Sequence, residues 1–208
     1  GTWDWQRPAL FCTREDLLTQ SFVYPYLIPM LENAGAVVFT TRERDYQTHE
    51  VIIDNDPHMT EEGLYIEEHS GMGGWSDNAE GFSTPDRALA DHDNPFTTGT
   101  ARYAQTVRGR RQPTAAAIWM PRIPAAGRYS VYVSYTTCSA SVSDAHYTVV
   151  HKGVASHFSV NQQMGGGTWV YLGTFDFDEG ATTSNLVALT NESAQNGVVS
   201  ADAVRFGG

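Results

Sequence analysis

The sequence has few positive charges, few cysteines and no long apolar run. Lys and Arg together number 13 against 24 Asp and Glu, which gives a net charge of −11. A surface this acidic repels phosphate backbones and anionic lipids, so we set aside nucleic acids and membrane surfaces as partners. No apolar stretch reaches the roughly 18 residues that a transmembrane helix needs. The charge balance favours a neutral or cationic partner, or serves solubility alone.

Only two cysteines, Cys12 and Cys138, occur among the 208 residues. We assign them to different structural units, and two thiols do not make a disulfide framework. Free thiols are therefore expected, with a single bridge as the alternative. The chain begins at Gly1 without a Met, which is typical of a trimmed or mature fragment.

Residues 1–49 have the pattern of an α/β segment. Residues 9–12 and 36–41 are short apolar runs that predict strands. Between them, Thr13 can cap a helix whose apolar residues recur every three to four positions. Pro25 and Pro29 are expected to kink this helix, and Gly35 to end it. The resulting βαβ unit is too small to cover both faces of a sheet, so we expect it to belong to a larger domain.

Residues 50–208 predict a mainly β domain. Glycine and aromatic residues are frequent and only 18% of the residues are charged, which favours strands and turns. Residues 57–100 are polar and weakly periodic, so a long irregular stretch is expected there. Lys152-Gly153 indicates a tight hairpin. The pattern predicts an antiparallel, jelly-roll-like two-sheet β-sandwich, with strands at residues 51–53, 64–67, 101–107, 115–120, 128–136, 145–151, 154–160, 168–177, 185–190 and 198–206.

No residue pattern in the chain marks a catalytic centre. The histidines lack the spacing of a zinc site, and no G-x-S-x-G motif occurs. The glycines at 165–167 join two strands and predict a turn rather than a phosphate-binding loop. Asp54, Asp56 and Asp202 are candidate calcium ligands, although turn formation explains Asp54 and Asp56 equally well.

Four aromatic residues lie in or beside the irregular stretch. Sugar-binding proteins expose aromatic ring faces that stack on the C–H-rich faces of pyranose rings. We therefore take as carbohydrate-binding candidates Trp75, Phe82, Phe96 and Tyr103. The alternative is that these rings pack the long loop onto the sandwich. Trp119 and Trp169 fall in predicted strands and are assigned to the core.

The second half of the chain carries several blocks of a recognisable pattern. Residues 117–133 contain a Trp, two prolines, the tripeptide Gly-Arg-Tyr and alternating Val and Tyr. Further matching blocks lie at residues 51–56, 145–151, 160–175 and 198–206. Together they resemble the golvesin C-terminal-like domain, also described as the xanthan-lyase carbohydrate-binding-like module. The resemblance covers roughly residues 50–208 and implies an all-β accessory module without a catalytic site of its own.

The first part is similar to zinc-dependent N-acetylmuramoyl-L-alanine amidases. Residues 31–35 match a helix ending "L-E-x-x-G", and residues 41–45 match a "T-R-x-x-D" signature. In that family a carboxylate at the start of the helix binds zinc, and Glu15 or Asp16 occupies this position. The two histidine motifs of the family are absent. The resemblance thus implies zinc only in a longer parent protein, and a carboxylate at a helix start also has an ordinary structural explanation.

Three functions fit these observations. The first is a non-catalytic, carbohydrate- or cell-wall-binding accessory module of a secreted or cell-envelope bacterial enzyme, acting on peptidoglycan or another polysaccharide. The second is a structural β-sandwich that shapes the cleft of a partner enzyme, such as the remainder of an amidase-like domain. The third is a polysaccharide lyase, which needs a Tyr or His base beside a charge neutraliser. The glycan and the oligomeric state are left open.

Overall fold

The structure, a computed structural model, describes residues 23–35, 47–56, 59–71, 73–84, 93–108 and 112–207. The strands predicted at residues 9–12 and 36–41 lie outside the described residues, as do Cys12, Thr13, Glu15 and Asp16. Where it is described, the predicted helix consists of a π-helical turn, η1 (Val23–Leu27), followed by α2 (Ile28–Asn33). None of the described helices has the length and hydropathy that crossing a membrane requires.

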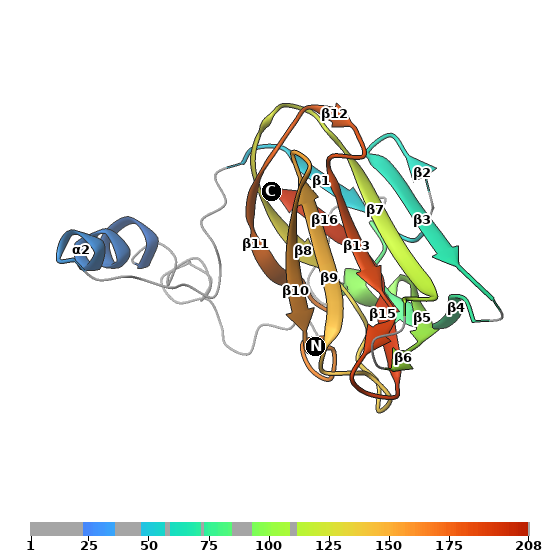
Figure 1. Cartoon of the computed structure of the whole chain (residues 1–208). Coiled ribbons are helices and arrows are strands. Elements are labelled where there is room, and N and C mark those ends of the chain that lie inside the picture. The colour runs from blue at the N-terminus through green and yellow to red at the C-terminus, as the bar shows by residue number, and fades with distance from the viewer. Residues whose placement is uncertain are drawn as a thin grey trace.

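Most of the described chain forms two antiparallel sheets that pack on each other, as predicted (Figure 1). The smaller sheet has four strands in the order β1-β16-β8-β11. These strands are β1 (Glu50–Ile53), β16 (Val204–Gly207), β8 (Gly127–Val133) and β11 (Val170–Phe177). The first strand therefore pairs with the last one, so both ends of the sandwich domain meet in this sheet.

The larger sheet has seven strands, with the order β10-β9-β13-β7-β3-β2 and β12 beside the end of β7. These are β10 (Val154–Val160), β9 (Ala145–His151), β13 (Leu186–Thr190), β7 (Ala115–Ile123), β3 (Gly63–His69), β2 (Met59–Thr60) and β12 (Gly180–Ala181). The hairpin between β9 and β10 turns at Lys152 and Gly153, both with positive φ, which confirms the predicted turn.

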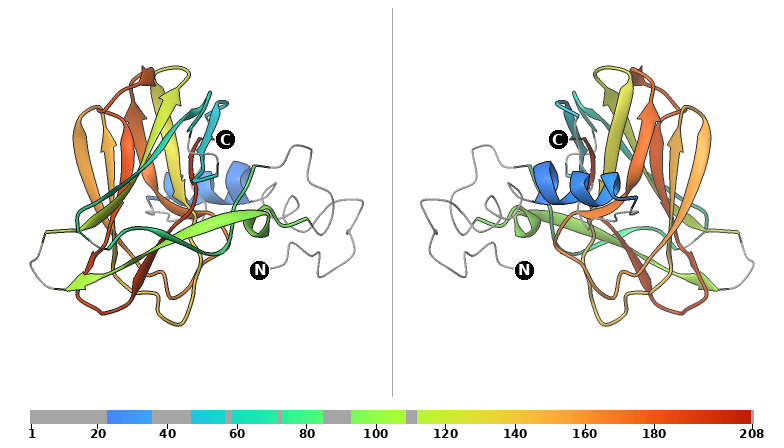
Figure 2. Two further views of the ribbon diagram at one scale, coloured as in Figure 1. Left: turned by 90° about the vertical axis from the view of Figure 1, so that its right-hand side faces the viewer. Right: turned by 90° about the vertical axis from the view of Figure 1, so that its left-hand side faces the viewer.

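Two small sheets extend the sandwich at one end. The first joins β15 (Val198–Ala201), β5 (Gly99–Gln105) and β4 (Ser76–Gly81); the second pairs β14 (Glu192–Ser193) with β6 (Val107–Arg108). The turned views of Figure 2 show β5 running across the lower end of the sandwich. The strand expected at residues 64–67 is present as β3. The rest of the stretch over residues 57–100 is less irregular than expected, since β2, β4 and the 3₁₀ turn η2 (Pro95–Thr97) also lie in it.

Two predicted strand ends were also wrong. The single strand expected at residues 198–206 is divided at Asp202 and Ala203 into β15 and β16, which belong to different sheets. The break is stabilised because Ser134 N donates to Ala203 O at 2.8 Å, and Asp202 is held by other partners. Likewise, β7 continues through Pro121 to Ile123, and the amide of Arg122 bonds to Glu62 O at 2.7 Å.

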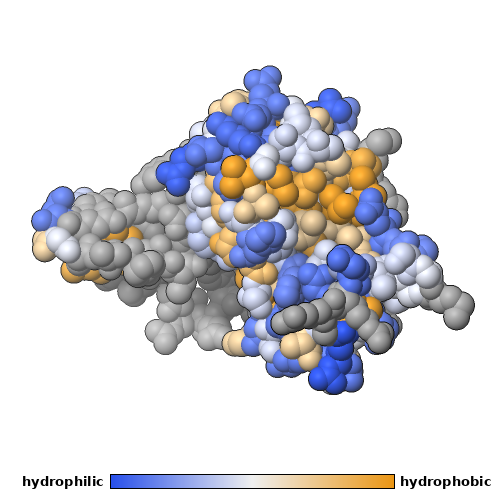
Figure 3. All heavy atoms as spheres, viewed as in Figure 1, coloured by the Kyte–Doolittle hydropathy of each residue, from blue (hydrophilic) through white to orange (hydrophobic). Residues whose placement is uncertain are grey.

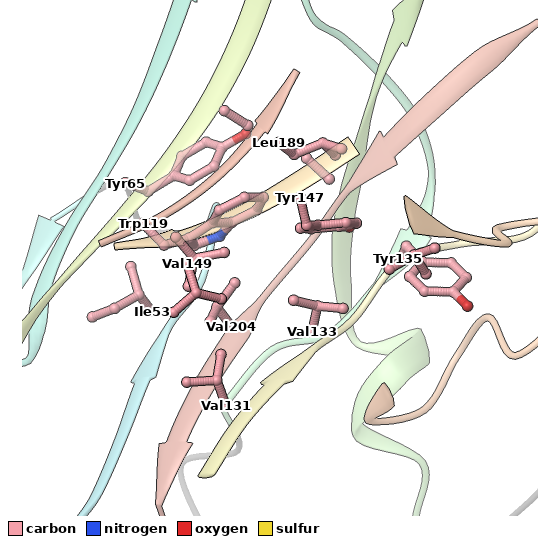
Figure 4. Packing of buried hydrophobic residues seen from close by; sticks show 14 of the residues in the cluster. Ile53, Tyr65, Trp119, Val131, Val133, Tyr135, Tyr147, Val149, Leu189 and Val204 are labelled. Atoms are coloured by element: carbon pink, nitrogen blue, oxygen red, sulfur yellow. The ribbon is translucent and has the colours of Figure 1, made fainter. Parts of the chain in front are cut away.

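Strand alternation produces the core. In β8 the side chains of Tyr129, Val131 and Val133 are fully buried, as their alternation predicted, and Tyr135 continues the row. Their counterparts from the larger sheet centre on Trp119, whose ring lies 5.5 Å from that of Tyr65 (Figure 4). Burying a side chain as large as Trp119 stabilises a fold by about 3–5 kcal/mol relative to alanine.

An ion-pair network joins β5 to β3. Arg102 contacts Glu67 through two bonds, Nε to Oε1 at 2.5 Å and Nη2 to Oε2 at 2.8 Å, and it also pairs with Asp77 in β4. Tyr65 donates to the same Glu67 Oε1 at 3.0 Å. A two-bond pair of this kind fixes geometry as well as charge, so the network sets the position of the three-stranded sheet on the larger one.

Candidate functional site

The predicted aromatic candidates are mostly part of the protein interior. Phe82 and Phe96 are each only 3% exposed, and they form a second core cluster with Ala203. Trp169 packs against this cluster, with its ring 4.9 Å from Phe82 and 5.4 Å from Phe96. Tyr103 is buried as well, and burial raises its pKa to about 12. These positions fit the packing alternative, in which the rings attach the long loop to the sandwich.

Trp75 is the candidate that keeps part of its surface in solvent. Its indole Nε1 donates to Ala116 O at 3.0 Å, and the ring packs against the edge of the main core. One side of the ring is thus fixed by the protein, while the side chain is only partly buried. Its role in binding sugar stays a prediction.

A second set of rings lies on the outer side of the four-stranded sheet, which sequence reasoning did not single out. Tyr132 in β8 is directly paired with Tyr171 in β11 and with Arg205 in β16. The two tyrosine rings are 5.4 Å apart, and the guanidinium of Arg205 lies 5.2 Å from the centre of the Tyr132 ring. All three side chains are partly exposed. A row of aromatic and cationic groups therefore crosses three neighbouring strands.

Hydroxyl groups continue this row. Tyr171 OH and Thr174 Oγ1 are 2.8 Å apart, and Ser130 Oγ lies 2.8 Å from the same Thr174 oxygen. At the other end, Arg205 Nε bonds to Glu50 Oε1 at 2.8 Å. We call this surface the tyrosine face and define it by Tyr132, Tyr171, Thr174 and Arg205; Ser130 is fully buried beneath it. Its flat aromatic groups, donors and acceptors suit a ligand that has both C–H faces and hydroxyls.

The outer side of the seven-stranded sheet has a different composition. Cross-strand pairing aligns Leu64 with Met120, Ile66 with Ile118, and Leu186 with Val150, all partly exposed. Figure 3 shows the resulting band of apolar residues over β3, β7 and β13. We call these six residues the aliphatic face. It offers contact area with few groups that bind in a fixed direction.

Acidic side chains gather where β1 ends and β16 begins. Burial raises the pKa of Asp54 to about 8, and repulsion from Asp202 adds to this. Burial also raises the pKa of Asp202 to about 7, although the hydroxyl of Ser134 and the amide of Phe82 donate to its carboxylate and oppose the increase. Asp56 accepts from the amide of Thr100 at 2.7 Å. With Asn55, we call these residues the acid cluster: Asp54, Asn55, Asp56 and Asp202.

Two further predictions concern metal binding and the state of the two cysteines. Among the described residues, no three His, Cys, Asp or Glu side chains are arranged as a ready metal-binding group. The zinc role predicted for Glu15 falls on a residue outside the described ones. Cys138 is exposed with a free thiol, whereas Cys12 also lies outside the described residues.

The fold and its outer faces define the class of this protein as an antiparallel β-sandwich module. The profile of the Golvesin C-terminal domain matches residues 92–208, more than half of the chain, and the chain belongs to this family. The golvesin-type resemblance of the sequence is thereby confirmed, and the amidase resemblance of residues 1–49 stays a prediction.

Two relatives are much longer proteins. A xanthan lyase from Bacillus sp. (strain GL1) is 30% identical over 128 residues, which span 56% of this chain and 14% of that protein. The structure of a Paenibacillus xanthan lyase matches with a TM-score of 0.53 and 26% identity, covering 76% of this chain and 13% of the lyase. The chain therefore corresponds to a small part of each enzyme.

Proposed function

We propose that this chain is a non-catalytic carbohydrate-binding module, and that the tyrosine face is the surface that binds glycan. The single observation that carries the proposal is the paired row of Tyr171, Tyr132 and Arg205 across three strands. Tyrosine rings stack on the C–H faces of pyranoses, and the neighbouring hydroxyls and guanidinium bond to sugar hydroxyls and carboxylates. The ligand would be peptidoglycan glycan or another polysaccharide, such as the xanthan named for the relatives.

The parent of this module would be a secreted or cell-envelope bacterial enzyme. Support comes from the two xanthan lyases, of which the matched part is about one seventh. A module of this size would bring an enzyme to its polymeric substrate and keep it there. Because a polymer offers many adjacent sites, even weak binding at one module raises the local concentration of the catalytic domain.

Calorimetric titration of the full chain with xanthan and with soluble peptidoglycan fragments tests this proposal. Saturable binding to at least one glycan is expected, and the double variant Tyr132→Ala/Tyr171→Ala should weaken it at least tenfold. Tyr26→Ala is the matched control, because Tyr26 is 64% exposed and lies on η1, away from the sheet. Trp75→Ala in the same titrations tests the remaining candidate from the sequence.

Two results would contradict the proposal. One is a flat isotherm with every glycan tested. The other is a double variant that folds, by circular dichroism, and binds as tightly as the Tyr26→Ala control.

The aliphatic face favours a second candidate function. A flat apolar surface of this kind is typical of protein contacts, and it would suit packing against the catalytic part of a longer enzyme. In this case the module shapes or supports a cleft and binds no sugar itself. Glycan binding that is lost on Ile118→Thr but retained in the tyrosine variants would assign glycan binding to the aliphatic face. Absence of glycan binding in the wild type and in all variants would favour this second function.

A further inference from the structure

Two neighbouring side chains in the acid cluster are buried with oxygen atoms that lack partners. Asp54 is only 4% exposed, and neither of its carboxylate oxygens has a hydrogen-bond partner among the described residues. Asn55 is 1% exposed, and its Oδ1 likewise has none, although its Nδ2 donates to Thr100 Oγ1 at 3.1 Å. Buried oxygens without partners are costly, and three of them in consecutive residues call for a ligand.

The strand register places a second buried carboxylate at the same position in the fold. Ile53 pairs with Val204, so Asp54 just after β1 and Asp202 just before β16 lie at the same end of this strand pair. Figure 4 shows Ile53 and Val204 side by side, next to Trp119. Asp202 is 1% exposed, and its carboxylate repels that of Asp54. The two carboxyl groups are therefore confined together inside the protein, where burial favours their neutral forms unless a cation is bound.

Asp202 differs from Asp54 in being anchored. The amide of Phe82 donates to both of its carboxylate oxygens, at 3.0 and 3.1 Å, and Ser134 donates to one of them. Its Oδ1 accepts only the Phe82 amide, so one of the two lone pairs of that oxygen is left for a further contact. Asp202 is thus held by the protein and can still bind a cation through Oδ1. The oxygens of Asp54 make no hydrogen bond of good geometry and have only weaker contacts with the amides of Asn55 and Asp56.

We propose that Asp54, Asn55 and Asp202 bind a calcium ion. The ion supplies the missing partner for the oxygens of Asp54 and Asn55, and its two positive charges balance the two carboxylates. These donors are hard oxygen atoms, which calcium accepts in irregular arrangements of six to eight ligands. Backbone carbonyls or water complete the set, since the described residues provide no group of three acidic side chains for it. Magnesium requires near-octahedral geometry and gives up water reluctantly, so it fits less well.

The position of the ion explains what it would do. Asp202 connects the β1–β16 pair to Phe82, which follows β4 directly, and Asn55 connects it to β5 through Thr100. One ion therefore joins the four-stranded sheet to the three-stranded sheet. Its effect is on the stability of this junction, independent of whether the tyrosine face binds glycan.

The test uses the full chain after removal of metal with a chelator. Calcium chloride is titrated into it by calorimetry, and thermal unfolding is followed with calcium, magnesium or sodium chloride. One calcium ion is expected to bind and to raise the unfolding temperature, with magnesium at least tenfold weaker. Terbium provides a second probe, because the Trp119 indole donates to Asp202 O at 2.9 Å and can sensitise terbium luminescence at this site.

Asp54→Asn is the diagnostic variant, since it removes a charged ligand without changing side-chain size. It should lower calcium affinity at least tenfold and abolish the terbium signal. Asp144→Asn is the matched control, because Asp144 accepts from Ser193 Oγ and the amide of Ala194 far from the cluster, and it should bind calcium like the wild type. Absence of saturable calcium binding to the wild-type chain, or equal affinity in a folded Asp54→Asn chain, would overturn the proposal.

Discussion

The two outer faces of the sandwich cover the same core but offer different chemistry. On the tyrosine face, Tyr132, Tyr171 and Arg205 are aligned by strand pairing, with hydroxyls beside them. On the aliphatic face, the aligned side chains are leucine, isoleucine, methionine and valine. The first surface can orient a polar ligand, whereas the second provides contact area alone. The comparison shows that the alternation of side chains along the strands decides which residues are buried. The chemistry of the outward side chains decides which face can bind a polar ligand specifically.

The largest change should affect both faces together. Trp119→Ala empties the centre of the core on which both sheets rest, and we expect it to lower the free energy of unfolding by about 4 kcal/mol. Urea unfolding followed by circular dichroism measures this loss. A loss below about 1 kcal/mol would show that the sheets are held together elsewhere, and would break the idea of one core shared by two faces.

The next largest effect concerns the acid cluster, which belongs to neither face. Burial raises the pKa of Asp54 from its ordinary value of 3.8 to about 8. Between these two pH values the folded chain therefore keeps a proton on Asp54 that the unfolded chain has already released. The stabilising contribution is complete below about pH 4 and is lost as the pH rises to about 8. Asp202 and Asp56 face the same group and repel it.

This pH effect is measured as a difference between two chains in chelator. From about pH 4 to 8 the wild type should lose about 5 kcal/mol relative to Asp54→Asn, in which the residue cannot ionise. Urea unfolding at several pH values gives the comparison. If the free energies of unfolding of the two chains changed with pH in parallel, this prediction would be contradicted. Unchanged glycan affinity of Asp54→Asn would show that the acid cluster acts independently of both outer faces.

A smaller effect separates ring stacking from hydrogen bonding on the tyrosine face. Tyr171→Ala should weaken glycan binding about tenfold, or about 1.4 kcal/mol. Tyr171→Phe keeps the ring and loses the bond to Thr174, so its affinity should fall by less than about threefold. Titration calorimetry distinguishes the two. If Tyr171→Phe were as damaging as Tyr171→Ala, the hydroxyl rather than the ring would be the binding group.

The smallest effect is expected on the aliphatic face. Ile118→Thr keeps a β-branched side chain on a partly exposed strand position, so the free energy of unfolding should change by about 1 kcal/mol or less. Glycan affinity should be the same as that of the wild type. A tenfold loss of affinity in a stable Ile118→Thr chain would reverse the roles that we assign to the two faces.

Much of the fold follows from local patterns. The alternation of Tyr129, Val131 and Val133 predicted the buried side of β8, and Lys152-Gly153 predicted the hairpin of β9 and β10. The break at Asp202 could not be predicted in this way, because its carboxylate is bound by the amide of Phe82, 120 residues away. Strand β4, which reads Ser-Asp-Asn-Ala-Glu-Gly, has no apolar alternation and forms through its pairing with β5.

The candidate surface was predictable only in part. Alternation in β8 places Tyr132 on the opposite side from the core residues, which was a usable signal. Its partner Tyr171 depends on the register of β11, which shifts between Tyr171 and Gly173 at an irregularity. Such a shift cannot be derived from the sequence of either strand alone. The aromatic residues that sequence reasoning preferred, Phe82 and Phe96, instead pack against each other at 5.3 Å.

Nuclear magnetic resonance of the labelled full chain during titration with a bound oligosaccharide tests the central claim most directly. We predict that the amide shifts of Tyr132, Tyr171, Thr174 and Arg205 change in a saturable manner, while those of Ile66 and Ile118 stay constant. Shifts confined to β3, β7 and β13, with the strands of the tyrosine face unchanged, would contradict the account.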